Sequence, residues 1–233
     1  AIGYFTTATK LHTIIMAFLL SFTNILFPRV SNLLAEGKND EFWKKINMAF
    51  DAIFLFAFPT ITYMLIAGPE LLHFVVGDGF EGSYLPLRII TPLILIIGIE
   101  QILVIQILIA MHCDNTVLRN SFVGALVTLL LNMLLTAKMG AVGSAIVWGI
   151  AECVIMGLSL NVIYKKFKYI LPFRRILTYI ITYTPLLLLL LLIYHNLSNI
   201  YVMMAVLSVL TADYTFVNEI FILKNKVAVQ LIH

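Results

Sequence analysis

Charged residues are scarce in this sequence. Asp, Glu, Lys and Arg make up 12% of its 233 residues, about half the share found in ordinary soluble domains. Hydrophobic residues make up 61%, and so few charged side chains could not cover that much apolar surface in water. The formal charge is only +3, so no basic field is present to hold a nucleic acid. The composition excludes a soluble globule and a nucleic-acid partner, and it indicates an integral membrane protein.

Groups that bind metals or attack substrates are also sparse. The two cysteines, Cys113 and Cys153, cannot form a disulfide framework. The five histidines are scattered, with no pair four residues apart and no cysteine at ligand spacing. The sequence has no P-loop for a nucleotide. We therefore predict no metal site, no cofactor, no catalytic residues and no enzymatic activity.

Long apolar runs, by contrast, are abundant. A helix needs about 20 apolar residues to span the hydrocarbon core, and the chain supplies seven such stretches. The run 186–193 is apolar at every position, whereas a strand of a membrane β-barrel would alternate. We predict an all-α, polytopic membrane protein with about seven transmembrane helices. The predicted spans are 5–34, 46–67, 86–111, 117–137, 140–163, 176–194 and 199–223.

Basic residues are distributed unevenly between the two sides. With seven spans, 12 of the 15 Lys and Arg residues fall in one set of connections, and the other set holds only Lys10, Arg88 and Lys138. Cytoplasmic loops carry the excess of Lys and Arg, so we predict a cytoplasmic C-terminus and place Ala1 outside. The sequence begins without an initiator Met, a basic region or a cleavage site. We therefore expect it to start within a longer protein.

Glycine and proline residues suggest how the helices pack and bend. Residues 77–82 (GDGFEG) match the letters of a dinucleotide-binding motif, but no strand precedes them, so we reject that function. Residues 140–145 (GAVGSA) are small and favour close helix packing. Prolines within the helical runs favour kinks, although membrane helices often tolerate them. These prolines are Pro28, Pro59, Pro92 and Pro185.

Ionisable side chains at membrane depth are the most informative residues. Glu100 and Glu152 lie near the middles of the third and fifth predicted helices, where each costs a few kcal/mol unless it faces water or a partner. Two explanations are open for Glu100 and Glu152: a pair or hydrogen bond inside the bundle that serves the structure, and a functional role. For Asp213, in the seventh helix, polar neighbours that include Glu219 suggest a weakly embedded helix and a structural role. Asn132 adds neutral polarity to the fourth helix.

Lys10 and Arg29 have a simpler explanation. They are about 28 Å apart along the first helix, nearly the thickness of the hydrocarbon core. Each side chain can reach an interface from its own end of the helix, so their positions require no function.

Several motifs resemble one family. Residues 3–11 (GYFTTATKL) and 26–31 (LFPRVS) resemble the "vGyYtaAtKl … lfPrlS" helix of bacterial Wzx-type polysaccharide flippases. These flippases form the polysaccharide-transporter branch of the multidrug/oligosaccharidyl-lipid/polysaccharide exporter superfamily. Residues 74–83 resemble that family's external loop, and residues 132–145 resemble its "lN … yGaiGaAia" stretch, with Glu152 where the family often has an acid. The sequence departs from the pattern at Phe5 and at Thr6-Thr7.

The resemblance implies an architecture and a function. The chain would be the C-terminal bundle of a fourteen-helix flippase in the bacterial cytoplasmic (inner) membrane, and the N-terminal half of the same protein would be its partner. In this family two bundles rock about a central cavity and move oligosaccharides to the outer leaflet. The sugar repeat is linked to undecaprenyl diphosphate, and an ion gradient drives the movement.

Other functions compete with this one. A drug exporter or another lipid-precursor exporter of the same superfamily is the alternative, because few cavity cations would favour drugs and clustered cations would favour a diphosphate. A membrane scaffold or a membrane glycosyltransferase fits less well, because the connections are short.

A diphosphate must be stabilised as it crosses hydrocarbon, and acids can bind the coupling ion. The candidates for contact with the substrate or cavity are Lys10, Arg29, Arg88 and Asn132. The candidates for ion coupling are Glu100 and Glu152.

Overall fold

The computed structural model describes residues 2–197 and 199–230, so Ala1, which we placed outside the membrane, lies outside the described residues. Within these ranges the chain forms helices and no strand. The helices are α1 (Ile2–Ala35), α2 (Asn39–Val76), η1 (Glu81–Ser83), α3 (Tyr84–Ile90), α4 (Leu93–Gln101), η2 (Ile102–Ile109), α5 (Asp114–Leu131), η3 (Asn132–Thr136), α6 (Ala137–Met139), α7 (Ala141–Phe167), α8 (Phe173–Asn196), α9 (Ile200–Val217), η4 (Asn218–Ile222) and α10 (Lys226–Gln230).

The described chain has enough helix to cross a membrane six or seven times. Six helices are long and apolar enough to span it, and a seventh span is the bent pair Glu81–Ile90 and Leu93–Ile109. The prediction of an all-α polytopic membrane protein is therefore confirmed. Helices occupy all seven predicted stretches, and most of their ends differ from the predicted bounds by a few residues.

Two predicted helices need correction. The span 86–111 is not one straight helix, because its axis bends by 44° at Thr91 and Pro92, where proline cannot donate a backbone hydrogen bond. Helices α1, α2 and α8 run through Pro28, Pro59 and Pro185 without a break. The span 46–67 was too short, since α2 begins at Asn39 and continues to Val76. Acidic residues in its first turn suit a helix N-terminus.

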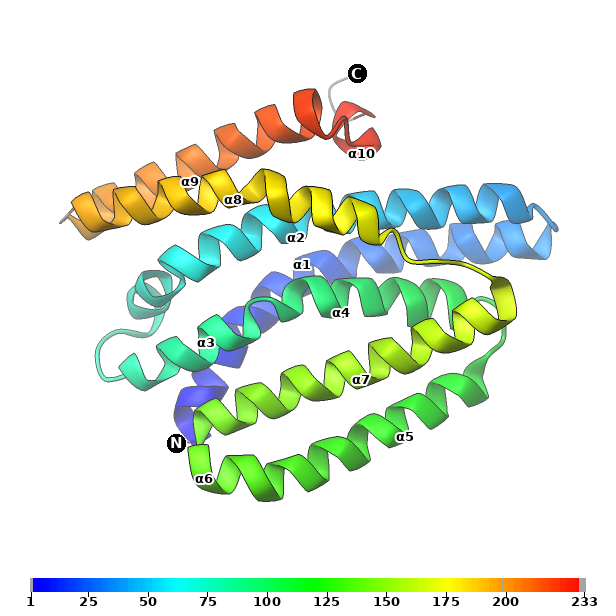
Figure 1. The fold of residues 1–233 in the computed structure, drawn as a ribbon, viewed down its shortest axis with the longest axis horizontal. Coiled ribbons are helices and arrows are strands. Elements are labelled where there is room, and N and C mark those ends of the chain that lie inside the picture. Colours follow the sequence, from blue (N-terminus) through cyan, green and yellow to red (C-terminus); the bar gives the residue numbers. More distant parts are fainter. Residues whose placement is uncertain (1, 198, 231–233) are drawn as a thin grey trace.

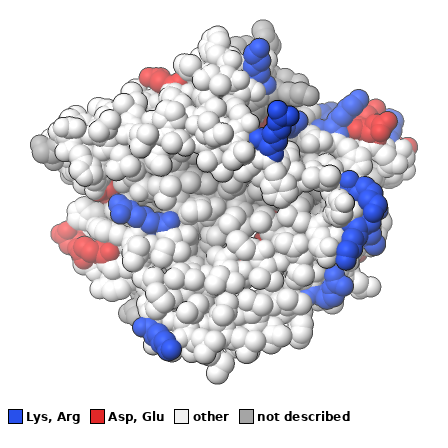
Figure 2. All heavy atoms as spheres, viewed as in Figure 1, with Lys and Arg blue, Asp and Glu red and all other residues white. Residues whose placement is uncertain are grey.

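The helices lie side by side, with their ends gathered at two edges of the bundle (Figure 1). Helix α2 is in contact with α1, α4, α8 and α9, and α7 is in contact with α3, α4 and α5. One edge holds the connections 36–38, 110–113 and 168–172. Figure 2 shows many of the Lys and Arg side chains of this face toward that edge, while the middle of the face is hollowed and almost uncharged.

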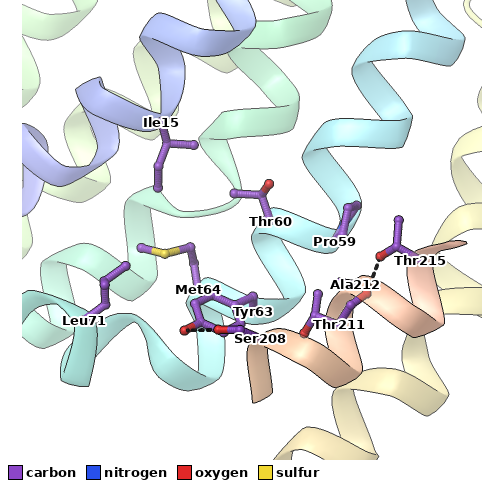
Figure 3. Close-up of a pocket in the computed structure, with 10 residues that line it drawn as sticks. All are labelled: Ile15, Pro59, Thr60, Tyr63, Met64, Leu71, Ser208, Thr211, Ala212 and Thr215. Carbon is purple, nitrogen blue, oxygen red and sulfur yellow. Dashed lines mark hydrogen bonds between the residues drawn. The ribbon is translucent and has the colours of Figure 1, made fainter. Parts of the chain in front are cut away.

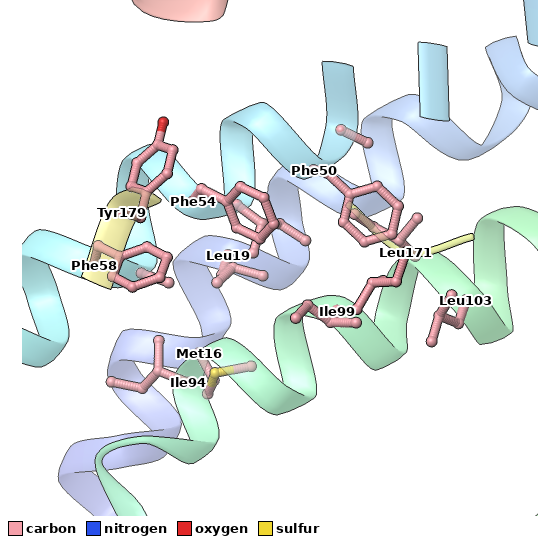
Figure 4. Close-up of a cluster of buried hydrophobic side chains, with 14 of the residues drawn as sticks. Met16, Leu19, Phe50, Phe54, Phe58, Ile94, Ile99, Leu103, Leu171 and Tyr179 are labelled. Carbon is pink, nitrogen blue, oxygen red and sulfur yellow. The ribbon is translucent and has the colours of Figure 1, made fainter. Parts of the chain in front are cut away.

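Aromatic rings along α2 form the centre of the core. Phe50, Phe54 and Phe58 recur every four residues, which places them on one side of the helix. Tyr179 from α8 stacks on Phe58 with ring centroids 4.9 Å apart. Figure 4 shows Met16 and Leu19 of α1 and Ile94 and Ile99 of α4 packed in the same cluster. The cluster thus joins the four helices α1, α2, α4 and α8.

The connection between α7 and α8 is fastened to α2. Tyr169 stacks on Trp43 with centroids 4.7 Å apart and planes 10° apart, and its hydroxyl donates to Asn47 Oδ1 at 3.2 Å. Burial raises the pKa of Tyr169 to about 12, so the hydroxyl remains protonated and keeps donating at neutral pH. This contact holds the beginning of α8 against the beginning of α2.

The small residues at the beginning of α7 allow close packing, as the sequence predicted. A Cβ atom at Gly143 would lie 2.5 Å from the carbonyl oxygen of Leu135 and 3.0 Å from Cα of Thr136. The backbones of α7 and η3 therefore approach as closely as glycine permits.

Candidate functional site

Two of the predicted site residues meet inside the bundle. Glu100 lies on α4 and Glu152 on α7, both half-buried. The two acids are close enough to interact electrostatically, and Glu100 Oε2 is buried without a hydrogen-bond partner. The indole Nε1 of Trp148, one turn before Glu152, donates to Glu152 Oε1 at 2.7 Å. The site is therefore a pair of acids from two helices, with one acid oriented by a tryptophan.

No basic side chain is bridged to this pair in the described part of the chain. The ion pairs there are Lys38–Glu36, His73–Asp78 and Arg175–Asp51. Two carboxylates at close range in a medium of low dielectric cannot both stay ionised without a compensating charge. A proton or a small cation shared between the two carboxylates would supply such a charge.

A histidine that the sequence analysis did not select completes the cluster. The ring of His12, on α1, packs edge-on against Trp148 with centroids 5.0 Å apart. Its side chain is 2% exposed, and its Nε2 atom has no hydrogen-bond partner. The sequence did contain a signal, since Ala8, His12 and Met16 occupy one stripe at helical spacing and all three are buried.

Asn132 lies in a pocket that adjoins this cluster. The pocket has a volume of about 410 Å³ and lies between α1, η3 and α7, with Thr9, Asn132, Ser144 and Trp148 among its lining residues. Asn132 Nδ2 donates to the backbone oxygen of Thr128 at 2.9 Å, and its Oδ1 accepts from the Thr136 hydroxyl at 2.6 Å. Because Trp148 lines the pocket and also contacts both His12 and Glu152, it connects Asn132 with the acid pair.

The three predicted cations lie elsewhere. Lys10, Arg29 and Arg88 are exposed, and none of them lines this pocket. Lys10 and Arg29 are near opposite ends of α1, and Arg88 lies near the contact in which the Tyr194 hydroxyl donates to Glu70. The structure therefore brings together Glu100, Glu152 and Asn132, but not the cations.

A second, neutral pocket lies between α1, α2 and α9. Its volume is about 450 Å³, and hydroxyl groups of Thr60, Tyr63, Ser208 and Thr211 are among those on its wall (Figure 3). The Ser208 hydroxyl lies 3.2 Å from that of Tyr63. None of the ten residues that line this pocket is charged.

The two acids near the C-terminal part of the seventh helix lie in different surroundings. Asp213 is exposed, but Glu219 is 1% exposed. The Glu219 carboxylate accepts hydrogen bonds from Tyr179 at 2.8 Å and from Tyr183 at 2.9 Å. These donors from α8 satisfy the acid inside the bundle. Sequence reasoning missed this buried acid because the polar residues of η4 do not reveal that Tyr179 and Tyr183 of another helix face Glu219.

Comparison with known proteins gives one informative match. No protein-family model matches the chain, and no solved structure matches it significantly. Over 161 residues the chain is 24% identical to a protein of Escherichia coli (strain K12) that is named "Putative O-antigen transporter". The match covers 69% of this chain and 38% of that protein. The chain is thus similar to part of a protein whose name agrees with the family that the motifs of this chain resemble.

Proposed function

We propose that this chain is the C-terminal helical bundle of a transporter that moves lipid-linked oligosaccharide repeat units to the outer leaflet of the bacterial cytoplasmic membrane. The observation that carries the proposal is the similarity to the Escherichia coli protein. The substrate would be linked to undecaprenyl diphosphate, and the other bundle would be the N-terminal half of the same protein.

The acid pair would couple transport to an ion gradient. With one proton or cation bound, Glu100 and Glu152 carry a single net negative charge and α4 can pack closely on α7. Without it, two unit charges about 4 Å apart repel by roughly 4 kcal/mol at an effective dielectric constant of about 20. Helix α4 begins directly after the 44° bend at Thr91 and Pro92, so it can shift relative to α3. Ion binding would therefore favour one arrangement of the helices and ion release another.

The exposed cations would act on the substrate rather than on the ion. Lys10, Arg29 and Arg88 are accessible from outside the chain, where a diphosphate between two bundles could reach them. Asn132 and the hydroxyl groups near it offer neutral hydrogen bonds of the kind that sugars form.

Deletion of the gene in the organism that carries it tests this function. We expect surface polysaccharide to disappear and lipid-linked repeat units to accumulate, because assembly of the repeat unit would continue without export. Surface polysaccharide is measured by gel electrophoresis, and lipid-linked sugars by mass spectrometry. Normal polysaccharide in the deletion strain would refute the proposal.

An exporter of drugs or of another lipid precursor is the second candidate. The observation that favours it is that neither the 450 Å³ pocket nor the 410 Å³ pocket is lined by a Lys or an Arg residue. A deletion strain with normal polysaccharide and greater sensitivity to cationic drugs would support this candidate.

We propose that the C-terminus and the loop with Lys38 are cytoplasmic and that the loop with Asp78 lies outside. Single cysteines test this orientation. In a variant with Cys113 and Cys153 replaced by Ser, we expect an impermeant thiol reagent to label Asp78→Cys in intact cells and to spare Lys38→Cys. Both side chains are exposed, Asp78 by 95% and Lys38 by 52%, so burial would not prevent labelling. The reverse pattern would show that the orientation is inverted.

A further inference from the structure

A third pocket differs from the other two because cations line it. It has a volume of about 210 Å³, lies between α2, the beginning of α8 and the turn after η4, and is lined by Asp51, Arg175, Thr178, Tyr179, Lys224 and Asn225, among others. It lies toward the end of the bundle where α8 begins. Figure 2 shows basic side chains over the beginning of α8 and beside α10.

Arg175 is held in place but not saturated. Its Nη1 atom donates to Asp51 Oδ1 at 2.7 Å, and its side chain remains 45% exposed. A guanidinium group has five N–H donors, so the bond to Asp51 orients the group and leaves donors for a ligand. Arg175, Lys224 and Asp51 together give the wall of the pocket a formal charge of +1.

Buried hydrogen bonds fix the turn that carries Lys224. Asn225 is 5% exposed, and its Nδ2 donates to the backbone oxygen of Asp51 at 2.8 Å and to the Tyr179 hydroxyl at 2.7 Å. The Tyr179 hydroxyl donates in turn to Glu219 at 2.8 Å. Asn225 thereby ties the turn to α2 and α8, and it places Lys224 on the same pocket as Arg175.

The backbone of Lys224 adopts a conformation that is unusual for lysine. Its φ is 49°, in the left-handed region, and the backbone N–H of Asn225 closes the helix end on the oxygen of Glu219 at 2.9 Å. Glycine is the usual residue at such a position because it has no Cβ to strain the backbone. A lysine here is less favourable for the backbone than glycine, so the Lys224 side chain can be removed by Lys224→Gly without straining the turn.

We propose that this pocket binds a phosphate group. Arg and Lys are the side chains that recognise phosphate through charge-assisted hydrogen bonds, and here both lie on one pocket whose geometry is fixed by buried contacts. The phosphate can come from an anionic lipid head group of the bilayer or from a soluble phosphate or diphosphate. This binding does not depend on the transport function proposed above.

Lys224→Gly separates binding from folding. The variant introduces glycine, the residue type that the left-handed turn prefers, so we expect its unfolding temperature without ligand to be unchanged or higher. We expect its affinity for phosphate to fall about tenfold, because one charge-assisted contact is lost. Lys168→Gly is the matched control, since Lys168 also ends a helix at φ 56° but lies over the ring of Tyr164, 5.7 Å from its centroid.

The measurement uses the complete gene product that contains this chain, purified into phosphatidylcholine nanodiscs. Inorganic pyrophosphate is titrated by calorimetry in one arm, and in the other the unfolding temperature is compared with and without phosphatidylglycerol in the disc. Binding of pyrophosphate that Lys224→Gly weakens and Lys168→Gly does not would identify a soluble source. The same pattern with phosphatidylglycerol alone would identify a lipid. If neither compound acts on the unaltered protein, or if both variants behave alike, the proposal is overturned.

Discussion

Glu100→Gln is expected to reduce surface polysaccharide by about 5- to 150-fold, the range that a coupling free energy of 1 to 3 kcal/mol produces. The substitution keeps the size of the side chain, but it removes the carboxyl group that we propose takes up and releases the ion. The helix pair would remain in the ion-bound arrangement, because the repulsion that separates α4 from α7 could no longer arise. Glu152→Gln should have a similar effect, with the added loss of the acceptor for Trp148 Nε1.

The controls for this prediction separate charge from fold. Asp213→Asn removes an acid that is exposed on α9, and it should leave export unchanged. Each variant is placed in the complete gene product, and its amount in the membrane is measured by immunoblot. If Glu100→Gln, Glu152→Gln and the double variant all export normally at unchanged abundance, the acid pair has only a structural role.

The sequence was sufficient to predict the class of fold, because membrane-spanning helices are set by local composition. A run of about 20 apolar residues has few alternatives in a membrane, so helices were found over all seven stretches. The bend at Pro92 was also indicated, because proline acts on its own helix. The true extent of α2 was missed, since its first turns beyond the apolar run are polar and α2 continues through Pro69.

The candidate site was only partly predictable, because it depends on which helices are neighbours. Depth alone selected Glu100 and Glu152, but nothing local indicates that α4 packs on α7 and that these two acids meet. The buried face of α1 could have drawn attention to His12, whereas Glu219 could be recognised only together with Tyr179 and Tyr183 of another helix. Long-range pairing of polar groups was therefore the information that the sequence did not reveal.

Gly143→Ala is expected to destabilise the protein by about 1 to 3 kcal/mol, the usual cost of adding a methyl group to a packed interface. The new Cβ would meet the carbonyl oxygen of Leu135 at 2.5 Å and its carbonyl carbon at 2.7 Å. These are backbone atoms, so no side chain can rotate away and α7 must move from η3. That movement would also stretch the contact between the hydroxyls of Thr136 and Ser144, which are 3.2 Å apart beside the Asn132 pocket.

Gly157→Ala, farther along the same helix, is the matched control. Nothing lies within 4 Å of the position of its Cβ, so alanine should stabilise α7 by about 0.5 to 1 kcal/mol through its better helix propensity. Thermal unfolding of the complete gene product in detergent measures both variants, and opposite signs are expected from the same chemical change at two positions of one helix. Equal shifts would mean that α7 and η3 do not pack at backbone distance. Lowered export by Gly143→Ala in a fully folded population would instead show that the close approach of these two segments matters for the Asn132 pocket itself.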